Sequence, residues 1–270
     1  MEKLKKRTQQ LKKKRPGYGE ILDFYQKVRE EQEKIKASLK LEPIHLKKEW
    51  KELLAKEGFP MLEKKGFPID IEASTTLFQS ICKVGKEANP YMTEQVRKIE
   101  EAIDNKKIDP KELLKAGVKE QKVEQIANQF GLDKKVFSFF IQESMKPSIE
   151  AGVERFFNEL ETENWLKGFC PICGSLPYLS LLKEEVGKRS LLCSFCGYQW
   201  RIERLVCPFC GNKEQESQQY FHAEGEEAYR IDLCDKCHQY IKTIDLRKIE
   251  AIDPILEDLA TLHLDILASQ

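Results

Sequence analysis

Four pairs of cysteines, each with two residues between its members, constrain this chain more than any other feature of its sequence. They lie between residues 170 and 237, in the segments CPIC, CSFC, CPFC and CDKC. A turn of this length lets both sulfurs point at one ion, and two facing turns supply four sulfurs in a tetrahedron, a ligand set that suits Zn²⁺ or a single iron ion. The sequence therefore predicts two metal sites, with the ligands Cys170, Cys173, Cys193, Cys196, Cys207, Cys210, Cys234 and Cys237.

The distances between the pairs indicate how they combine. Nineteen residues separate the first pair from the second and 23 separate the third from the fourth, lengths that join two metal-binding turns in a zinc-ribbon or rubredoxin-like unit. Only 10 residues lie between the second and third pairs. We therefore expect neighbouring pairs to share an ion, which gives two sequential modules. Alternating pairs would give a cross-braced unit instead.

The cysteine spacing leaves the role of the ions open. They could only stabilise small ribbons, they could include redox-active iron, or their thiolates could pass sulfur or metal to a partner. His222 and His238 lie near the second site, but eight cysteines already complete two tetrahedra, so we expect neither histidine to be a ligand. Cys82 falls on the apolar face of an expected helix and is interpreted as a core thiol.

The first 165 residues carry helical patterns. Apolar residues recur with a period near 3.6, as at Ile21, Tyr25 and Val28, and Asp109-Pro110 is typical of a helix start. Residues 58–70 are punctuated by glycine and proline and are expected to form a loop. Pro147 is expected to separate two helices.

The N-terminal segment from Lys3 to Arg15 contains eight basic residues. It could contact an acidic partner, but a solvated and partly disordered tail is the favoured interpretation.

Charge and hydropathy exclude several classes of protein. Residues 213–270 hold 6 basic and 13 acidic side chains, a net charge of −7 that suits a nucleic-acid backbone poorly. No apolar run approaches the ~18 residues of a membrane-spanning helix, so we expect no membrane insertion. The basic N-terminus lacks the apolar core of a signal peptide, which predicts a cytoplasmic protein. In that compartment nine cysteines favour metal ligands over disulfides.

These patterns together predict an α+β protein. An all-helical N-terminal domain, residues 1–166, is followed by two small rubredoxin-like or zinc-ribbon modules, residues 167–205 and 206–270. The second module ends in one C-terminal helix, which Asp253-Pro254 opens.

The segments CPICGSLP, LLCSFCGYQWRIERLVCPFCG, YRIDLCDKCHQYIK and LEDLATLHLDILA, in this order, resemble the formate dehydrogenase accessory protein family, FdhE. The resemblance covers residues 168–270. It implies a helical domain followed by two rubredoxin-like modules, with iron associated with the eight cysteines. It also implies a cytoplasmic maturation factor that binds the catalytic subunit of formate dehydrogenase and is not itself an enzyme.

Two other functions compete with this one: a rubredoxin-like electron carrier or thiol oxidoreductase, and a zinc-ribbon nucleic-acid-binding protein. Apart from the cysteines, no positioned acid, base or nucleophile stands out in the sequence. The linker between the modules carries Trp200, Arg201 and Arg204, and tryptophan and arginine are frequent anchors at protein interfaces. We expect these three residues to contact the partner. The alternative is that Trp200 packs between the modules and the arginines pair with local carboxylates.

Overall fold

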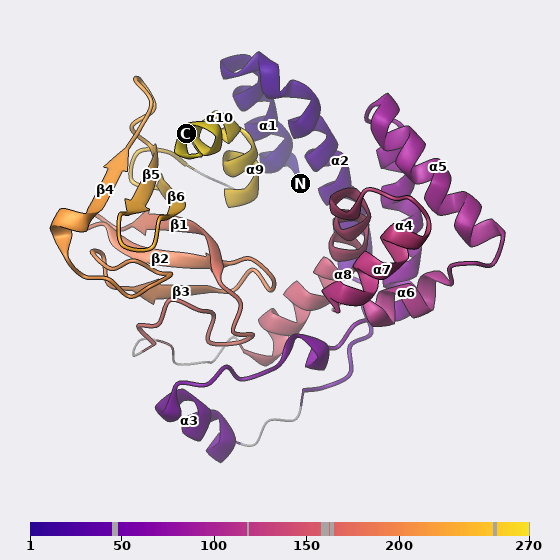
Figure 1. Ribbon diagram of the computed structural model, residues 1–270, viewed down its shortest axis with the longest axis horizontal. Helices are drawn as coiled ribbons and strands as arrows, with labels where there is room; N and C mark the ends of the chain where they lie inside the picture. The colour runs from indigo at the N-terminus through magenta and orange to yellow at the C-terminus, as the bar shows by residue number, and fades with distance from the viewer. Residues whose placement is uncertain (45–47, 118, 158–161, 163–164, 251–252, 270) are drawn as a thin grey trace. The chain divides into compact units, whose positions relative to one another are not determined.

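The chain folds into two compact units, which we call the helical unit and the sheet unit. The helical unit comprises residues 1–8, 19–44 and 64–156, and the sheet unit comprises 9–18, 45–63 and 157–270. The predicted α+β class is confirmed (Figure 1). Two N-terminal segments, residues 9–18 and 45–63, belong to the sheet unit. The computed structural model describes residues 1–44, 48–117, 119–157, 162, 165–250 and 253–269.

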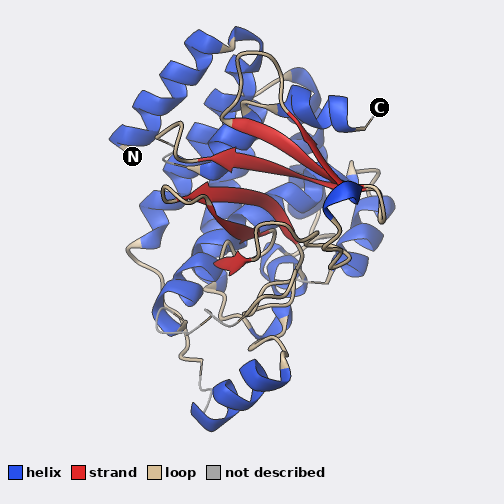
Figure 2. Ribbon diagram, turned by 90° about the vertical axis from the view of Figure 1, so that its left-hand side faces the viewer, coloured by secondary structure: helices blue, strands red, loops and turns tan. Residues whose placement is uncertain are grey.

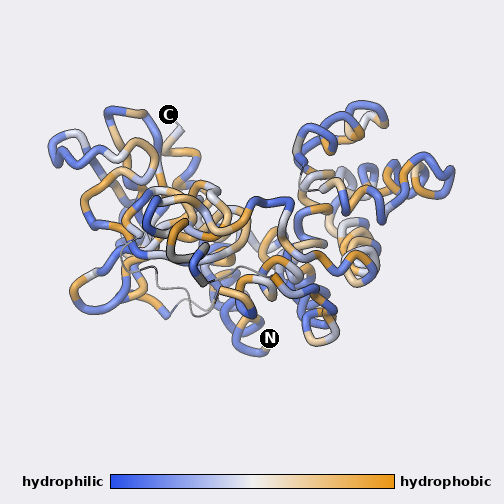
Figure 3. Tube along the Cα trace, turned by 90° about the horizontal axis from the view of Figure 1, so that it is seen from below, coloured by the Kyte–Doolittle hydropathy of each residue, from blue (hydrophilic) through white to orange (hydrophobic). Residues whose placement is uncertain are grey.

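The helical unit is built around α4, which packs against α2, α5, α6 and α8. Hydrophilic and hydrophobic stretches alternate along the helices (Figure 3), as expected when one face of each is buried. Asp109 caps α6 as predicted, because its carboxylate accepts the N–H of Lys111 at 2.8 Å. No helix among the described residues is both long and apolar enough to cross a membrane. The elements are α2 (Gly19–Lys36), α4 (Ile71–Lys86), α5 (Pro90–Asp104), α6 (Pro110–Ala116), α7 (Glu120–Gln129) and α8 (Lys134–Phe156).

Helix α8 runs through Pro147, so the prediction of two helices separated at this proline was wrong. Proline has no N–H to donate to the carbonyl of Glu143, one turn earlier. The Nε2 of Gln32, in α2, donates to that carbonyl at 2.8 Å and also to the Glu143 carboxylate at 2.8 Å. Gln32 is buried, with 2% of its surface exposed. The helix therefore continues because a neighbouring side chain replaces the missing backbone donor.

The basic N-terminus is a helix, α1 (Glu2–Lys14), and not a disordered tail. Leu4, Thr8 and Leu11 are buried on one face at helical spacing, and Arg15 just beyond the helix is buried too. The Arg15 guanidinium pairs with Glu226 at 2.7 Å and lies 4.9 Å from the ring centre of Tyr229, both in the sheet unit. In the sequence, the many basic residues of this segment obscure its helical period.

The sheet consists of two three-stranded antiparallel meanders, β1–β3 and β4–β6, which are joined by pairing of β1 with β6. Strand β1 of the first meander lies parallel to β6 of the second, with Leu179 opposite Lys242. The strand order is therefore β3-β2-β1-β6-β5-β4, a single six-stranded sheet (Figure 2). The strands are β1 (Pro177–Lys183), β2 (Lys188–Cys193), β3 (Gln199–Ile202), β4 (Gln218–Phe221), β5 (Tyr229–Cys234) and β6 (Gln239–Asp245).

One face of this sheet is apolar and packs against two short helices at the end of the chain, α9 (Pro254–Leu259) and α10 (Leu262–Ala268). Within this face the buried ammonium of Lys242 lies 2.7 Å from Asp258 and 2.6 Å from Asp265. Burial raises the pKa of Asp258, and the charge of Lys242 opposes that shift. The ion pairs therefore fix both helices to β6. The buried core here contains Leu179, Leu181, Tyr229, Ile231, Ile244 and Leu264.

The prediction of a single C-terminal helix needs correction. Asp253 caps the first helix as expected, accepting the N–H of Ile255 at 2.9 Å. The helix ends at Leu259 and a second begins at Leu262. Between them, the hydroxyl of Thr261 donates to the carbonyl of Glu257 at 2.9 Å, a local bond that competes with helical pairing.

Replacing Gln32 by leucine tests the role assigned to it. The variant keeps the side-chain size but leaves the Glu143 carbonyl without its donor, so we expect the free energy of unfolding to fall by about 1–3 kcal/mol in chemical denaturation. Glu33→Ala, at an exposed position of the same helix, should change it by less than about 0.5 kcal/mol. An unchanged midpoint for the leucine variant would show that α8 tolerates Pro147 without this bond.

Candidate metal centres

The first cysteine group gathers four buried sulfurs from two turns. Cys170 and Cys173 precede β1, whereas Cys193 ends β2 and Cys196 follows it. The Sγ–Sγ distances are 3.6 Å for Cys170–Cys196, 3.4 Å for Cys173–Cys193 and 3.7 Å for Cys173–Cys196. The backbone N–H groups of Phe195 and Cys196 both donate to Cys193 Sγ at 3.4 Å. Amide donors of this kind stabilise a thiolate.

The second group repeats the arrangement in the other half of the sheet unit. Cys207 and Cys210 precede β4, Cys234 ends β5 and Cys237 follows it. The Sγ–Sγ distances are 3.6 Å for Cys207–Cys237 and 3.7 Å for Cys210–Cys234. The side-chain amide of Asn212 donates to Cys234 Sγ at 3.7 Å. The predicted pairing of neighbouring CxxC segments is therefore confirmed, and the cross-braced alternative is wrong.

The turns that carry the cysteines share one backbone geometry. In the first turn, Gly174 N–H donates to the Cys170 carbonyl at 2.9 Å, and in the third, Gly211 N–H donates to the Cys207 carbonyl at 2.9 Å. The two glycines have φ of +71° and +72°. Since this conformation is strained for most residues with a Cβ, glycine is favoured after each CPxC segment, although His238 adopts φ of +54° at the same place of the fourth turn.

The spacing of the sulfurs fits a tetrahedral ion. With metal–sulfur bonds of about 2.3 Å, the edges of a tetrahedron are about 3.8 Å long. The observed separations of 3.4–3.7 Å lie close to that edge, and they are far beyond the roughly 2.05 Å of a disulfide bond. Four thiolates suit both Zn²⁺ and iron, so each group could hold one ion of either element.

The thiols of the second group differ in acidity because their surroundings differ. Burial raises the pKa of Cys207 to about 12. Burial acts in the same direction on Cys234, but hydrogen bonds from the backbone N–H groups of Cys237 and Lys236 lower its pKa to about 7. Cys234 therefore gives up its proton more easily than Cys207, and a bound cation would further favour the thiolates of the group.

The remaining candidates from the sequence lie outside the two groups. His222 and His238 are both exposed. Cys82 is 3% exposed in α4, and burial raises its pKa to about 12, so it is a core thiol as predicted.

The expected contact between Trp200 and a partner needs correction. Trp200 is 1% exposed, and its indole N–H donates to the Lys167 carbonyl at 2.9 Å. Arg201 and Arg204 are exposed, and Arg204 donates to the Val186 carbonyl at 3.4 Å. The predicted partner-binding residues are thereby reduced to the two arginines.

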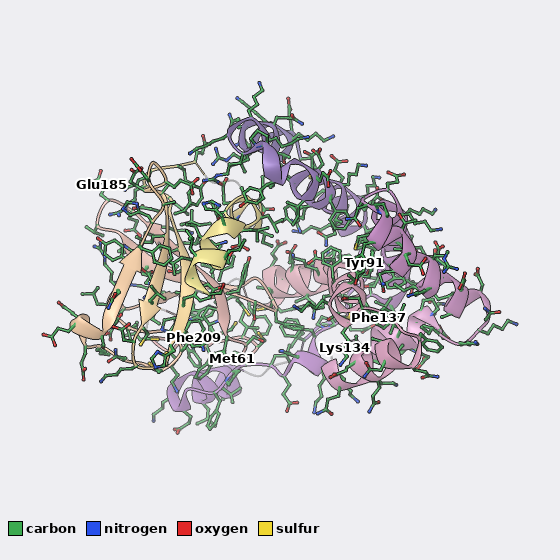
Figure 4. All side chains as sticks on the ribbon, turned by 45° about the horizontal axis from the view of Figure 1, so that its top comes forward. Met61, Tyr91, Lys134, Phe137, Glu185 and Phe209 are labelled. Atoms are coloured by element: carbon green, nitrogen blue, oxygen red, sulfur yellow. The ribbon has the colours of Figure 1, made fainter. Side chains whose placement is uncertain are left out.

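A segment from the N-terminal half covers the first cysteine turn, which sequence reasoning missed. We call residues 58–62 the strap. The N–H groups of Met61 and Leu62 donate to the carbonyls of Pro171 and Ile172 at 2.9 and 2.8 Å. Met61, labelled in Figure 4, is itself buried. This segment has neither a helical or strand period nor a binding motif. The sequence predicted only that it forms a loop, which does not indicate what the loop contacts.

A buried arginine fixes the linker between the modules. Arg189, in β2, donates to Ser180 Oγ at 2.9 Å and to the Val206 carbonyl at 2.8 Å. It also lies 3.5 Å from the Asp232 carboxylate of the second meander. The guanidinium therefore connects the linker to both meanders. In the sequence this arginine is one of many basic residues and carries no distinguishing signal.

Comparisons with known proteins agree with the resemblance seen in the sequence. Family models described as "FdhE, central domain" and "FdhE, C-terminal domain" match residues 169–204 and 205–270. A "Protein FdhE homolog" from Aquifex aeolicus is 29% identical over 267 residues, which are 96% of this chain and 87% of that protein. One from Shewanella oneidensis is 37% identical over 101 residues, 37% of this chain and 33% of that protein.

The fold is similar to that of a solved structure as well. The crystal structure of the FdhE protein from Pseudomonas aeruginosa superposes with a TM-score of 0.68, covering 98% of this chain and 89% of that one at 22% identity.

Metal analysis tests the two groups directly. Anaerobically purified protein should contain close to two ions per chain, one for each group. Cys173→Ser should remove one ion and unfold the local module, because metal binding supplies much of the folding free energy of such small units. Cys82→Ser, in the helical core, should keep both ions. If the ions are iron, the oxidised protein should be red and bleach reversibly with reductant. A metal-free chain that remains fully folded would contradict the assignment.

Gly168 offers a test of the contact between the two modules. A Cβ at this position would lie 1.8 Å from the Pro208 carbonyl oxygen, which belongs to the third cysteine turn. Gly168→Ala should therefore destabilise the protein by about 1–3 kcal/mol in chemical denaturation. The matched control is Gly17→Ala in the same unit, where a Cβ meets nothing within 4 Å. Equal stability of the two variants would mean that the contact between Gly168 and the third cysteine turn does not contribute to stability.

Proposed function

This chain belongs to the FdhE family, and from that premise we propose that it is an accessory factor in the maturation of formate dehydrogenase. In this proposal it acts in the cytoplasm, binds the catalytic subunit, and has no catalytic activity of its own. The observation that carries the proposal is that both four-cysteine groups fall within the two segments that match the family models.

We propose all eight cysteines of these groups as ligands of two resident ions, iron or zinc. The sulfur spacing and the backbone donors support this assignment. The ninth cysteine, Cys82, is buried in the helical unit. With every thiol either grouped or buried, an accessory role is favoured over that of a thiol oxidoreductase.

The division of the chain into residues 1–166, 167–205 and 206–270 remains part of the proposal. Each of the two C-terminal parts has one four-cysteine group and one meander, which supports the boundary near residue 205. Because β1 and β6 pair in one sheet, we expect these two parts to stabilise each other.

Burial of Trp200 disfavours the nucleic-acid alternative, because it removes one aromatic face on which a base could stack at the linker. The acidic character of residues 213–270 remains unfavourable for binding a phosphate backbone.

Arg201 and Arg204 are the residues we propose for docking the catalytic subunit. Replacing both by alanine should weaken co-purification with that subunit from cell extract, because exposed arginines often anchor protein interfaces. Metal content and thermal stability should stay unchanged. Arg97→Ala with Lys98→Ala, on α5 of the helical unit, removes the same charge and serves as the control. Undiminished binding of the linker variant would rule out the docking surface, and absence of the subunit from the parent's eluate would contradict the proposed function itself.

A further inference from the structure

The two four-cysteine groups are unequally accessible, although their turns have the same geometry. All four cysteines of the first group are buried. In the second group Cys210 is exposed and Cys237 is partly exposed. The cysteines at the same places in the first group, Cys173 and Cys196, are 7% and 2% exposed. The difference therefore comes from what surrounds the turns.

The strap accounts for the closure of the first group. It donates two backbone hydrogen bonds to the first cysteine turn, and the Pro60 ring lies close enough to Gly174 that a Cβ there would meet it at 2.8 Å. The ammonium of Lys167 donates to the Gly58 carbonyl at 2.9 Å and holds the other end of the strap. Within the described part of the chain, no backbone N–H donates to the corresponding carbonyls of Pro208 and Phe209.

The second group also borders a cavity. A hollow of about 190 Å³ lies between the linker and strands β4 and β5, and its lining includes Cys207 and Cys234. Every cysteine of this group thus borders either solvent or the cavity. Arg189, Arg204 and Arg230 line the hollow together with a single carboxylate, that of Asp232. Among the lining residues other than the cysteines, three arginines face one carboxylate, so this part of the wall is positively charged and attracts an anionic ligand.

We propose that the second group is an exchange site, which passes its ion to an external thiolate, while the first group keeps its ion. The inference rests on the proposed metal sites and goes beyond them by assigning different tasks to the two groups. In the loaded protein the exposed Cys210 would be displaced first: the incoming thiolate would form one metal–sulfur bond in place of the one that breaks, and the Cys210 thiolate would take up a proton from solvent. Exchange of the remaining three metal–sulfur bonds in the same way would release the ion.

Zinc release from the full-length, zinc-loaded chain tests the proposal. With 4-(2-pyridylazo)resorcinol as the chromophoric acceptor, one ion per chain should leave at least about tenfold faster than the other, a contrast of the size that surrounding contacts impose on metal sites. Cys210→Ser should abolish the fast phase and keep the slow one. Release of both ions at one rate, or loss of the slow phase in this variant, would overturn the proposal. A chain that binds no zinc at all would overturn the metal sites as well.

A substitution in the strap tests whether the strap slows release of the ion from the first group. Leu62→Pro deletes the N–H that donates to the Ile172 carbonyl, so it should accelerate release of the slow ion. Leu62→Ala keeps that N–H and is the matched control. If the proline and alanine variants release the slow ion equally fast, the strap does not protect the first group.

Thiol chemistry supplies a readout that is independent of the chelator. Iodoacetamide should modify Cys210 first in the zinc-loaded protein, while Cys82 and the first group stay unmodified. Mercaptoethanesulfonate should accelerate the fast phase more than cysteamine, a thiol of similar size and opposite charge, because the cavity is cationic. Modification of the first group before Cys210, or a larger effect of cysteamine, would contradict the proposed route.

Discussion

The parallel pairing of β1 with β6 is the interaction on which the sheet unit depends. Each meander alone has three short strands and would leave β1 or β6 as an unpaired edge. Pairing from Leu179–Lys242 to Leu182–Asp245 removes both edges. It also makes one continuous apolar face wide enough to receive α9 and α10. Parallel neighbours require a long crossover, and here the crossover contains the whole of the second cysteine group.

Buried charges determine how the pieces join. Lys242 holds two helices through Asp258 and Asp265, and Arg189 holds the linker through the Val206 carbonyl while it also donates to Ser180 of β1. Such groups contribute little net stability when they are fully paired, but they are costly when one partner is missing. Their effect is therefore to disfavour other arrangements of the linker and of the C-terminal helices. The family-like ending LEDLATLHLD contains both carboxylates that Lys242 requires.

Duplication of the cysteine turn did not produce two equal sites. The hydrogen bonds and glycine conformations of the first and third turns agree closely, yet one turn is covered and the other borders a cavity. The covering strap comes from residues 58–62, more than 100 positions before the turn that it contacts. In the roles proposed above, the covered group would keep its ion and the group beside the cavity would exchange it with a partner.

Local spacing was enough to predict the two four-cysteine groups, the pairing of neighbouring CxxC segments, the helical N-terminal region and the caps at Asp109 and Asp253. Each of these depends on residues close together in the chain, where turn geometry and helical period leave few alternatives. Contacts between distant segments decided the rest. Gln32 lets α8 pass through Pro147, burial removes Trp200 from the surface, and the strap closes one site and not the other. Each of these outcomes depends on a group that a remote segment brings into contact. A hydrogen bond requires its donor and acceptor to lie within about 3 Å, and the spacing of residues in the sequence does not determine which remote groups come that close.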